Sequence, residues 1–531
     1  MVSVIDIGII IGYLVLMMVV GYVAGRNNTN QEDYFLAGRS MPWLPIALSV
    51  AATMISANGF IGGPGWAYTS GMSPVMVNIA VPLAVVFALS ITTPVIYRMN
   101  VTSVYQYMEK RLGKYSKTLT IIQFFVNSII QISSMVYIPV LILQAMTGWS
   151  FYVLVPLVVI TSIIYTLLGG IRAVIWTDSI QMVLVIGAVV LVIATALSEI
   201  GLGFFDTLSI AQEAGKLDTM IFTTDITVEN AFWATLIGGF VMWFRYFCFD
   251  QSQVQRVLTA KSLKSAKNAF VVSAIVMNVV YYIMLLVGVF LFVFYDGKAF
   301  ETSNEVMITF ILNEMPVGAI GLIIAGVFAA AMSSVDSLLN SMTAVFTKDV
   351  YETLFHKEKE ATLKVSMIIS VVIGIAMTIV IFIGFNGSVK SILDTVGSYI
   401  SYFAGPAAGA FILAMFTKKA NDKGVSIGFV LGLIVGYYIA VTYHVNWLWN
   451  PFIGATITCI CGYFISLIFY KEDEMQETYE YTALGMRKRL IQEGVEDENG
   501  VRTLPFTMGK HEVIVIGFFV IQYIILYVIQ Y

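Results

Sequence analysis

The sequence predicts an all-α polytopic membrane protein with about fourteen transmembrane helices and both ends of the chain outside. Of its 531 residues, 58% are hydrophobic and only 12% are charged, whereas soluble proteins carry about 25% charged residues. Apolar segments of bilayer-spanning length recur along the whole chain. We place the spans at residues 4–25, 43–70, 75–97, 118–146, 150–168, 174–199, 230–253, 268–296, 317–347, 362–385, 390–416, 424–444, 449–470 and 512–530.

The placement of basic residues supports this arrangement. With the N-terminus outside, nearly all of the 29 Lys and Arg residues fall in inner loops, as the positive-inside rule requires. The exceptions are Lys216, Lys298 and Lys390, which fall outside, and Arg245, which falls within a span. We therefore expect a multi-pass protein of the cell membrane, either a bacterial inner membrane or a plasma membrane.

Composition and motifs argue against several classes of function. The net charge of −4 does not suggest a nucleic-acid partner, and no GxxxxGK[ST] nucleotide loop is present. The HExxH motif does not occur, and the three Cys and three His residues lack metal-binding spacing. We therefore expect no enzyme, no nucleotide-driven pump and no cofactor.

Polar residues gather on one stripe of the apolar segment 325–341. At 100° per residue, Ala330, Ser333, Ser334, Ser337, Asn340 and Ser341 share one side of a helix. Lipid offers these groups no hydrogen bonds, so the stripe must face protein, water or an ion. Adjacent hydroxyls and a carbonyl one turn earlier suit a small hard cation. Hydrogen bonding of the serines to their own helix is the alternative.

The second span contains a cluster of helix-breaking residues. Gly59, Gly62, Gly63, Pro64 and Gly65 interrupt it and leave backbone carbonyls without helical partners. At membrane depth such carbonyls must line a cavity or coordinate a ligand, and transporters use broken helices in this way near the bilayer midplane. A glycine groove for helix packing is the alternative.

Four motifs make the chain resemble the sodium:solute symporter family. They are YFLAGR (34–39), GGIRAVIWTDSIQ (169–181), DQSQVQRVLTAKS (250–262) and AAAMSSVDSLLNS (329–341). The resemblance implies a LeuT-like fold, in which two inverted repeats of five helices carry extra helices at each end. The implied division is a first helix and inner loop (1–42), the first repeat (43–199), an acidic outer loop (200–229), the second repeat (230–416), two spans (417–470), a charged inner connector (471–511) and a last span (512–531).

The resemblance also implies a sodium site and an ion path. The ligands would be the carbonyls of Ala52, Ile55 and Ala330 and the hydroxyls of Ser333 and Ser334. Asp178 matches an acid that the family keeps near the inner path of sodium, and a structural ion pair with Arg172 or Arg256 is its alternative. Asp336 and Ser337 are candidates for a second cation site, and neutralisation of Arg245 is an alternative role for Asp336.

Substrate would bind between the second, third, seventh and eleventh spans. Tyr246 matches the inner gate tyrosine, and Trp243 matches a position that holds sugar in the sugar carriers. Gly59 and Gly397 replace further hydrogen-bonding side chains of those carriers, which disfavours a hexose because buried sugar hydroxyls need partners. The secondary candidates, each of which could equally be a helix-packing polar group, are Ser56, Asn58, Asn78, Thr395 and Ser398.

Arg245 suggests a carboxylate. An unpaired guanidinium within a span is costly, so Arg245 either pairs with Asp250, Asp336 or Asp178 or receives a substrate carboxylate. The stretch SANGFIGGPGWAY resembles pantothenate permeases, and DQSQVQR resembles the monocarboxylate and multivitamin branch.

We therefore expect a sodium-coupled symporter that imports a small organic anion and functions as a monomer. A sugar or sialic acid substrate, or coupling to protons through Asp178 or Asp336, is the alternative within transport. A transporter-like membrane sensor is a more distant alternative.

Overall fold

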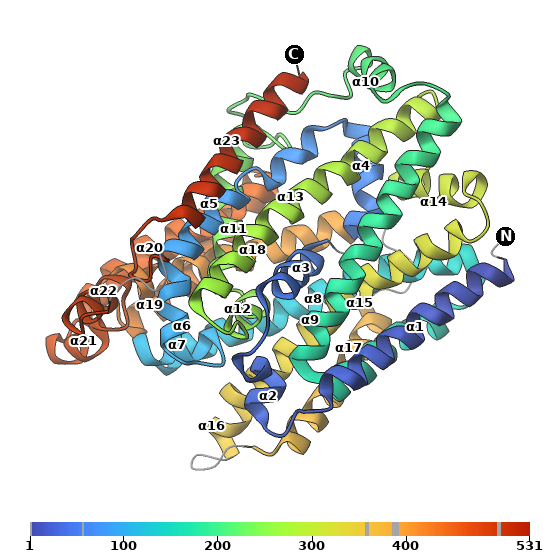
Figure 1. Ribbon diagram of the computed structural model, residues 1–531. Helices are drawn as coiled ribbons and strands as arrows, with labels where there is room; N and C mark the ends of the chain where they lie inside the picture. The colour runs from blue at the N-terminus through green and yellow to red at the C-terminus, as the bar shows by residue number, and fades with distance from the viewer. Residues whose placement is uncertain (1–2, 56–57, 356–360, 385–391, 496–500, 531) are drawn as a thin grey trace.

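The computed structural model describes residues 3–55, 58–355, 361–384, 392–495 and 501–530 (Figure 1). These residues form helices joined by loops, with isolated bridges but no β-sheet among them. The long apolar helices are α1 (Val4–Gly25), α8 (Lys114–Thr147), α9 (Phe151–Ile200), α13 (Leu263–Phe294), α15 (Ala319–Val345), α17 (Leu363–Gly384), α19 (Asp422–Thr442), α20 (Asn450–Ile468) and α23 (Lys510–Gln530), together with the interrupted segment Ser73–Arg98. The helix α18 (Ile392–Phe416) contains a shorter apolar stretch.

Ten helices of the described chain are long and apolar enough to cross a membrane, or up to eleven if a bent pair counts as one span. The helix α9 contains 50 residues and covers two predicted spans, while Ala234–Phe249 and Ile400–Phe416 are shorter apolar helices within two others. Each predicted segment thus overlaps helical structure. The count of fourteen, the side on which the termini lie and the repeat boundaries stay predictions.

Gly170 separates the two halves of α9. Its φ of 57° and ψ of −153° are not helical and lie in a region open mainly to glycine. A Cβ at Gly170 would stand 2.5 Å from the carbonyl oxygen of Tyr34, and one at Gly25 would stand 1.7 Å from the carbonyl oxygen of Leu168. The break therefore allows the chain after α1 to pack tightly against α9.

Three apolar segments are interrupted rather than straight. The second span consists of α3 (Trp43–Met54) and α4 (Gly63–Ser70), bent by 65° around the π-turn η2 (Asn58–Gly62). The third contains the 3₁₀ segment η3 (Ser73–Asn78), α5 (Val81–Phe87), the π-turn η4 (Ala88–Thr92) and α6 (Thr93–Arg98). The seventh contains the π-turn η5 (Ala234–Gly238), α11 (Gly239–Phe249) and α12 (Gln251–Leu258). Such irregular turns often mark functional sites.

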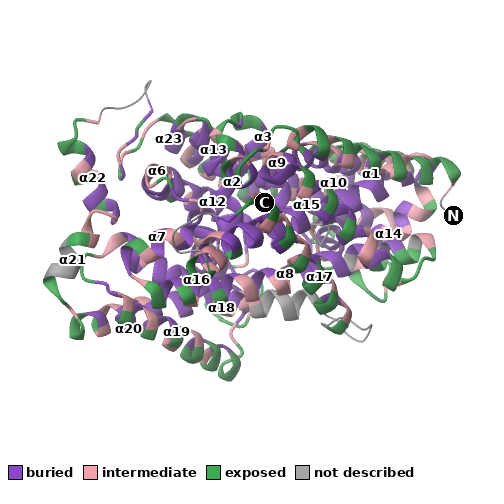
Figure 2. Ribbon diagram, turned by 90° about the horizontal axis from the view of Figure 1, so that it is seen from below, coloured by how far each residue is buried: buried purple, intermediate pink, exposed green. Residues whose placement is uncertain are grey.

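The polar stripe predicted on 325–341 belongs to the most buried helix. In the most apolar stretch of the helix containing α15, 94% of residues are buried, compared with 22% in α23. Figure 2 shows α15 as a purple ribbon enclosed by other helices, and it packs against α9, α8, α1 and α17. The serines of α15 therefore face protein on every side, whereas α23 lies at the periphery.

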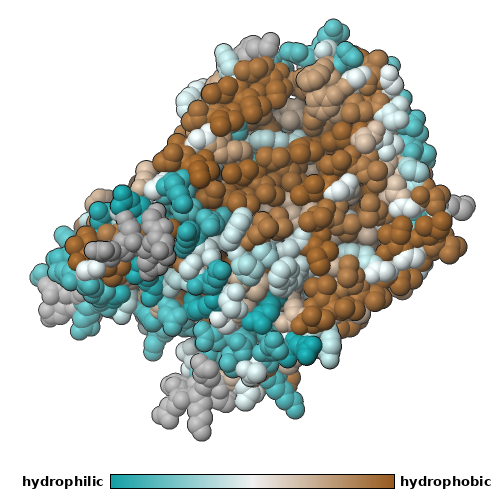
Figure 3. Space-filling view, in the orientation of Figure 1, coloured by the Kyte–Doolittle hydropathy of each residue, from teal (hydrophilic) through white to brown (hydrophobic). Residues whose placement is uncertain are grey.

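Apolar side chains cover much of the outer surface. Figure 3 shows a broad brown area over α1, α9, α13 and α23, with hydrophilic side chains gathered at the end that carries α7, α21 and α22. The short helices of the connections are α2 (Gln31–Leu36), α7 (Val104–Arg111), α10 (Phe204–Glu213), α14 (Ser303–Glu314), α16 (Glu352–Phe355), α21 (Glu472–Tyr479) and α22 (Ala483–Gln492).

The charged connector predicted over residues 471–511 packs against the helices. Met486 and Leu490 of α22 are buried. The buried guanidinium of Arg111 donates to the carbonyls of Ala414 at 3.0 Å and Ala420 at 3.2 Å and to the hydroxyl of Thr478 at 3.4 Å. Arg111 thereby joins α7, the end of α18 and α21, because cations stabilise the carbonyl end of a helix.

Candidate functional site

Four of the five predicted sodium ligands line one small cavity. Ala52 and Ile55, at the end of α3, face Ala330 and Ser333 of α15 across it. Gln181, Met182 and Val185 of α9 complete the lining. The cavity therefore lies where the first half of the broken span meets the polar stripe.

The oxygen atoms around this cavity have the spacing of cation ligands. The Ser333 hydroxyl oxygen lies 3.4 Å from the carbonyl oxygen of Ala52 and 3.2 Å from that of Ala330. The Ser334 hydroxyl oxygen lies 3.2 Å from the same Ala330 carbonyl. Neighbouring octahedral ligands about 2.4 Å from a hard cation stand roughly 3.4 Å from each other. The set fits a monovalent cation because none of its five ligands carries a formal charge.

A buried ion pair lies beside this cavity. The Arg256 guanidinium on α12 donates from Nη2 to Asp178 Oδ2 of α9 at 3.0 Å, and both side chains are fully buried. The Ser49 hydroxyl on α3 donates to the same carboxylate oxygen at 2.6 Å and accepts from Arg256 Nε at 2.6 Å. Of the two partners considered for Asp178, the structure places Arg256 in contact.

Asp336 has a different environment. Its Oδ2 accepts from the Tyr165 hydroxyl at 2.6 Å, and its Oδ1 accepts from the Ser337 hydroxyl at 3.2 Å. Ser337 also contacts Arg256 and Thr53. Among the described residues, no basic side chain forms an ion pair with Asp336. Asp178, Asp336 and Arg256, which we name the charge cluster, therefore carry one excess negative charge when ionised.

The charge cluster and the sodium ligands are directly connected. Ser337 lies one turn after Ser333 on α15, and its hydroxyl contacts the Ser333 carbonyl. The Thr53 hydroxyl, next to Ala52, lies 3.2 Å from that of Ser337. A cation leaving the cavity along α15 would therefore meet the charge cluster next.

The predicted substrate residues of the seventh span contact the third span and one another. The Trp243 indole N–H donates to the carbonyl of Val77 at 2.8 Å. The rings of Trp243 and Tyr246 meet edge to face with centroids 5.7 Å apart, and the Tyr246 hydroxyl accepts from the Gln253 amide. Asn78, at the end of η3, is 6% exposed.

Arg245 is engaged within the protein. Its Nη1 lies 3.0 Å from Asp250 Oδ2, and the two side chains are 13% and 10% exposed. Asp250 also caps α12 by accepting from the Ser252 backbone N–H at 3.0 Å. Of the partners considered for Arg245, Asp250 is the one in contact, while Asp178 and Asp336 belong to the charge cluster.

The remaining candidates lie around the break in the second span and on α18. A Cβ added at Gly59, in η2, would have no neighbouring atom within 4 Å, so this position borders open space. Ser56 lies outside the described residues, and the side chains of Asn58, Thr395 and Ser398 are not described either.

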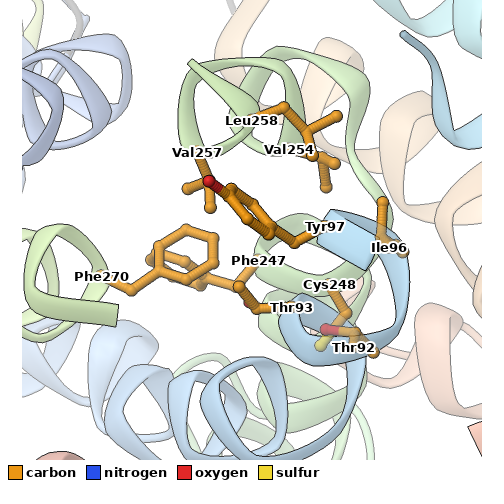
Figure 4. A pocket seen from close by; sticks show the side chains of 10 residues that line it. All are labelled: Thr92, Thr93, Ile96, Tyr97, Phe247, Cys248, Val254, Val257, Leu258 and Phe270. Carbon is orange, nitrogen blue, oxygen red and sulfur yellow. The ribbon is translucent and has the colours of Figure 1, made fainter. Parts of the chain in front are cut away.

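A separate cavity lies between α6, α11, α12 and α13 (Figure 4). Apolar side chains such as Phe247, Val257 and Phe270 dominate its lining, with Thr92 and Cys248 at one edge. No residue predicted to bind ion or substrate lines it. We therefore assign the functional site to the sodium ligands and the charge cluster.

The sequence named Arg256 only as one of two possible partners of Asp178 and did not predict the charge cluster. It placed Arg256 in an inner loop, although the structure buries that side chain completely. Neither Tyr165 nor Ser49 was a candidate. The available signal was that DQSQVQR contains a basic residue in a short amphipathic helix, but only tertiary packing reveals its partner.

Comparison with known proteins decides the family. The profile of the "Sodium:solute symporter family" matches residues 34–432. The chain belongs to this family. The sodium/sialic acid symporter NanT of Aliivibrio fischeri is 30% identical over 481 residues, which cover 89% of this chain and 94% of that protein. The human sodium-coupled monocarboxylate transporter 1 is 27% identical over 450 residues, which cover 82% of this chain and 73% of that protein.

A solved structure has the same architecture. A substrate-bound, outward-open Na⁺-coupled sialic acid symporter, reported to reveal a novel Na⁺ site, superposes with a TM-score of 0.80 and 27% identity. The match covers 88% of this chain and 98% of that structure. These findings confirm the predicted family, the LeuT-like fold and a multi-pass membrane protein that is a secondary transporter and not an enzyme.

The two arginines should differ sharply in their effect on stability. We expect Arg256→Leu to destabilise the symporter by about 3–5 kcal/mol, because it leaves the buried Asp178 carboxylate without its cation. Arg245→Leu should cost less, about 1–2 kcal/mol, because Asp250 keeps its hydrogen bonds from the backbone N–H and the hydroxyl of Ser252. Thermal unfolding of the detergent-solubilised variants measures both. The double variant Arg256→Leu with Asp178→Leu should recover stability, and equal losses for the two single variants would contradict the assignment.

Proposed function

We propose that the chain is a sodium-coupled symporter that imports a small carboxylate-bearing organic anion by alternating access. The observation that carries the proposal is the 65° break in the second span beside the hydroxyls of Ser333 and Ser334. The family supports sodium as the coupling ion, and the ligand spacing around the cavity supports the assigned site.

The broken span supplies electrostatic fields of both signs. The carbonyl end of α3, at Ala52 and Ile55, bears partial negative charge, which favours a cation. The segment that restarts at Gly59 presents backbone N–H groups with partial positive charge, which favours an anion. Broken helices of transporters hold sodium and substrate carboxylates in this manner. One bent helix can therefore bind both solutes.

The relatives support an organic anion as the substrate class. Sialic acid is a sugar acid, and one relative is described as a monocarboxylate transporter. A neutral hexose would need side-chain partners for its hydroxyls, but the indole N–H of Trp243 already donates to Val77 and position 59 has no side chain. Because Arg245 pairs with Asp250, the carboxylate is assigned to the N–H groups of the broken span instead.

Coupling follows from the position of the cation. A sodium ion held by Ala52 and Ile55 on one side and by Ala330, Ser333 and Ser334 on the other joins α3 to α15. It thereby stabilises the arrangement of the broken span in which the substrate groups converge. Sodium must then raise the affinity for substrate by the same factor by which substrate raises the affinity for sodium.

The substrate class is tested by thermal stabilisation of purified protein. We expect a carboxylate, either N-acetylneuraminate or L-lactate, to raise the unfolding temperature in sodium but not in choline, because the two solutes bind cooperatively. D-glucose and the methyl ester of N-acetylneuraminate serve as neutral controls. A sodium-dependent shift with glucose alone would overturn the substrate class. No sodium effect with any ligand would instead favour proton coupling or a sensor.

The sodium site is tested by a matched pair of serine substitutions. Ser334→Ala should raise the sodium concentration for half-maximal uptake about tenfold, equivalent to about 1.4 kcal/mol, while the protein stays folded. Ser341 lies two turns later on the same stripe, and its hydroxyl has no hydrogen-bond partner among the described residues, so Ser341→Ala should leave sodium dependence unchanged. Wild-type sodium dependence in Ser334→Ala would show that the assigned site is wrong.

A second candidate is an additional cation, sodium or proton, at the charge cluster. The excess negative charge of Asp178, Asp336 and Arg256 supports it, because an uncompensated buried charge is costly. The unpartnered Oδ1 of Asp178 and the nearby Ser337 hydroxyl are hard oxygen groups available to such a cation. Proton uptake by Asp336 would neutralise the charge cluster equally well.

The additional cation is tested by the ratio of transported ions to substrate. Asp336→Asn keeps the shape of the side chain but removes its charge, so we expect the number of cations moved per substrate to fall by one. Radioactive sodium uptake and acidification of proteoliposomes together distinguish a sodium ion from a proton. An unchanged ratio in both assays would exclude a transported cation at Asp336.

A further inference from the structure

We propose that Gln522, on the peripheral helix α23, is a positioning residue that holds the 3₁₀ segment η3 in place at the substrate site. The inference rests on the proposed function, because it assigns substrate to the region between the second, third and seventh spans. Gln522 was not among the candidates from the sequence.

A buried glutamine in this helix needs an explanation. Only 22% of the most apolar stretch of α23 is buried, yet Gln522 within it is 3% exposed. Its amide nitrogen donates to the carbonyl of Ile79 at 2.9 Å, and its amide oxygen accepts from the Tyr282 hydroxyl at 3.0 Å. An apolar side chain would suffice for packing, whereas a polar group inside a membrane helix is costly and usually functional.

The segment that Gln522 contacts depends on side chains for its hydrogen bonds. A 3₁₀ helix closes shorter and poorer hydrogen bonds than an α-helix, and Ile79 precedes Ala80, the first residue before α5. Its carbonyl therefore lies outside the α-helical ladder. Side chains from three helices bind this stretch of backbone: Tyr281 of α13 donates to Pro74 at 3.2 Å, Trp243 of α11 to Val77 at 2.8 Å and Gln522 of α23 to Ile79 at 2.9 Å.

These contacts surround a candidate substrate residue. Asn78 lies between the two carbonyls held by Trp243 and Gln522, and its side chain forms no hydrogen bond with the described residues. The indole of Trp243 in turn meets Tyr246. Loss of the Gln522 contact would therefore free the backbone after Asn78, at Ile79, while Trp243 still holds the backbone before it, at Val77.

The helix α23 has other attachments, which separate positioning from anchoring. Lys267 and Glu512 form a fully buried ion pair at 2.9 Å near the start of α23. At its other end the Gln530 amide oxygen accepts from the backbone N–H of Met220 at 3.0 Å and the Thr219 hydroxyl at 3.2 Å. Gln530 thus provides a matched control, a glutamine of the same helix that contacts an outer loop and not the third span.

The test combines hydrogen–deuterium exchange with uptake for Gln522→Leu and Gln530→Leu. We expect Gln522→Leu to accelerate exchange of the backbone amides of residues 73–80 about tenfold, because local opening becomes easier, with no change there in Gln530→Leu. For whichever of N-acetylneuraminate and L-lactate the wild type imports, KM should rise about tenfold in Gln522→Leu with kcat within about twofold. Tyr282→Phe leaves the Gln522 amide donor in place but removes the hydroxyl that orients it, so this variant should give an intermediate KM.

The outcomes separate this inference from the proposed function. Unchanged exchange in Gln522→Leu, or equal effects of Gln522→Leu and Gln530→Leu on exchange and KM, would overturn the positioning role. A fall in kcat with unchanged KM would also overturn it and would indicate a part in conformational change. If the wild type imports neither carboxylate, the proposed substrate class fails, and hydrogen–deuterium exchange still decides whether Gln522 holds the 3₁₀ segment.

Discussion

The Arg256 guanidinium is the group on which the packing of α3, α9, α12 and α15 depends. From α12 it contacts Ser49 of α3, Asp178 of α9 and Ser337 of α15, so four helices meet at one charge. The side chain is fully buried, and a buried guanidinium is tolerated only when its donors are satisfied by neighbouring acceptors. The need to satisfy Arg256 therefore constrains the relative positions of these helices more strongly than apolar packing, which has no direction.

The same constraint connects the ion path with alternating access. The Ser337 hydroxyl contacts Arg256 of the charge cluster and also the carbonyl of Ser333, a proposed sodium ligand. A cation that enters or leaves along α15 thus changes the electrostatic environment of Arg256 and Asp178. Because these groups hold α12 against α3 and α9, occupancy of the cavity and the position of α12 are linked. Such linkage is what a symporter requires to couple two solutes.

The third and seventh spans show how irregular backbone is stabilised inside a membrane protein. Their π-turns and 3₁₀ segment leave carbonyls outside regular ladders, and aromatic or amide side chains from neighbouring helices satisfy them. The contact between Trp243 and Val77 is one example, and the contact between Gln522 and Ile79 is another. The cost of the irregular backbone is thereby offset in part by α23, a helix outside the proposed substrate region.

The sequence alone determined the all-α membrane fold, the positions of its apolar segments, the break in the second span and the family. Hydropathy, glycine clusters and motifs are local properties, so they can be read residue by residue. It also placed Ala330 and Ser333, which line the cavity, on one polar stripe of one helix. Only the tertiary structure decided the partners of the charged groups. Asp178 had two possible basic partners, and Arg245 had three possible acidic ones. Which groups pair depends on how helices distant in sequence pack together, and a local sequence pattern does not determine that packing. For the same reason Gln522 reads in sequence as an ordinary polar residue near the end of the chain, and only its distance to Ile79 connects it with the substrate site.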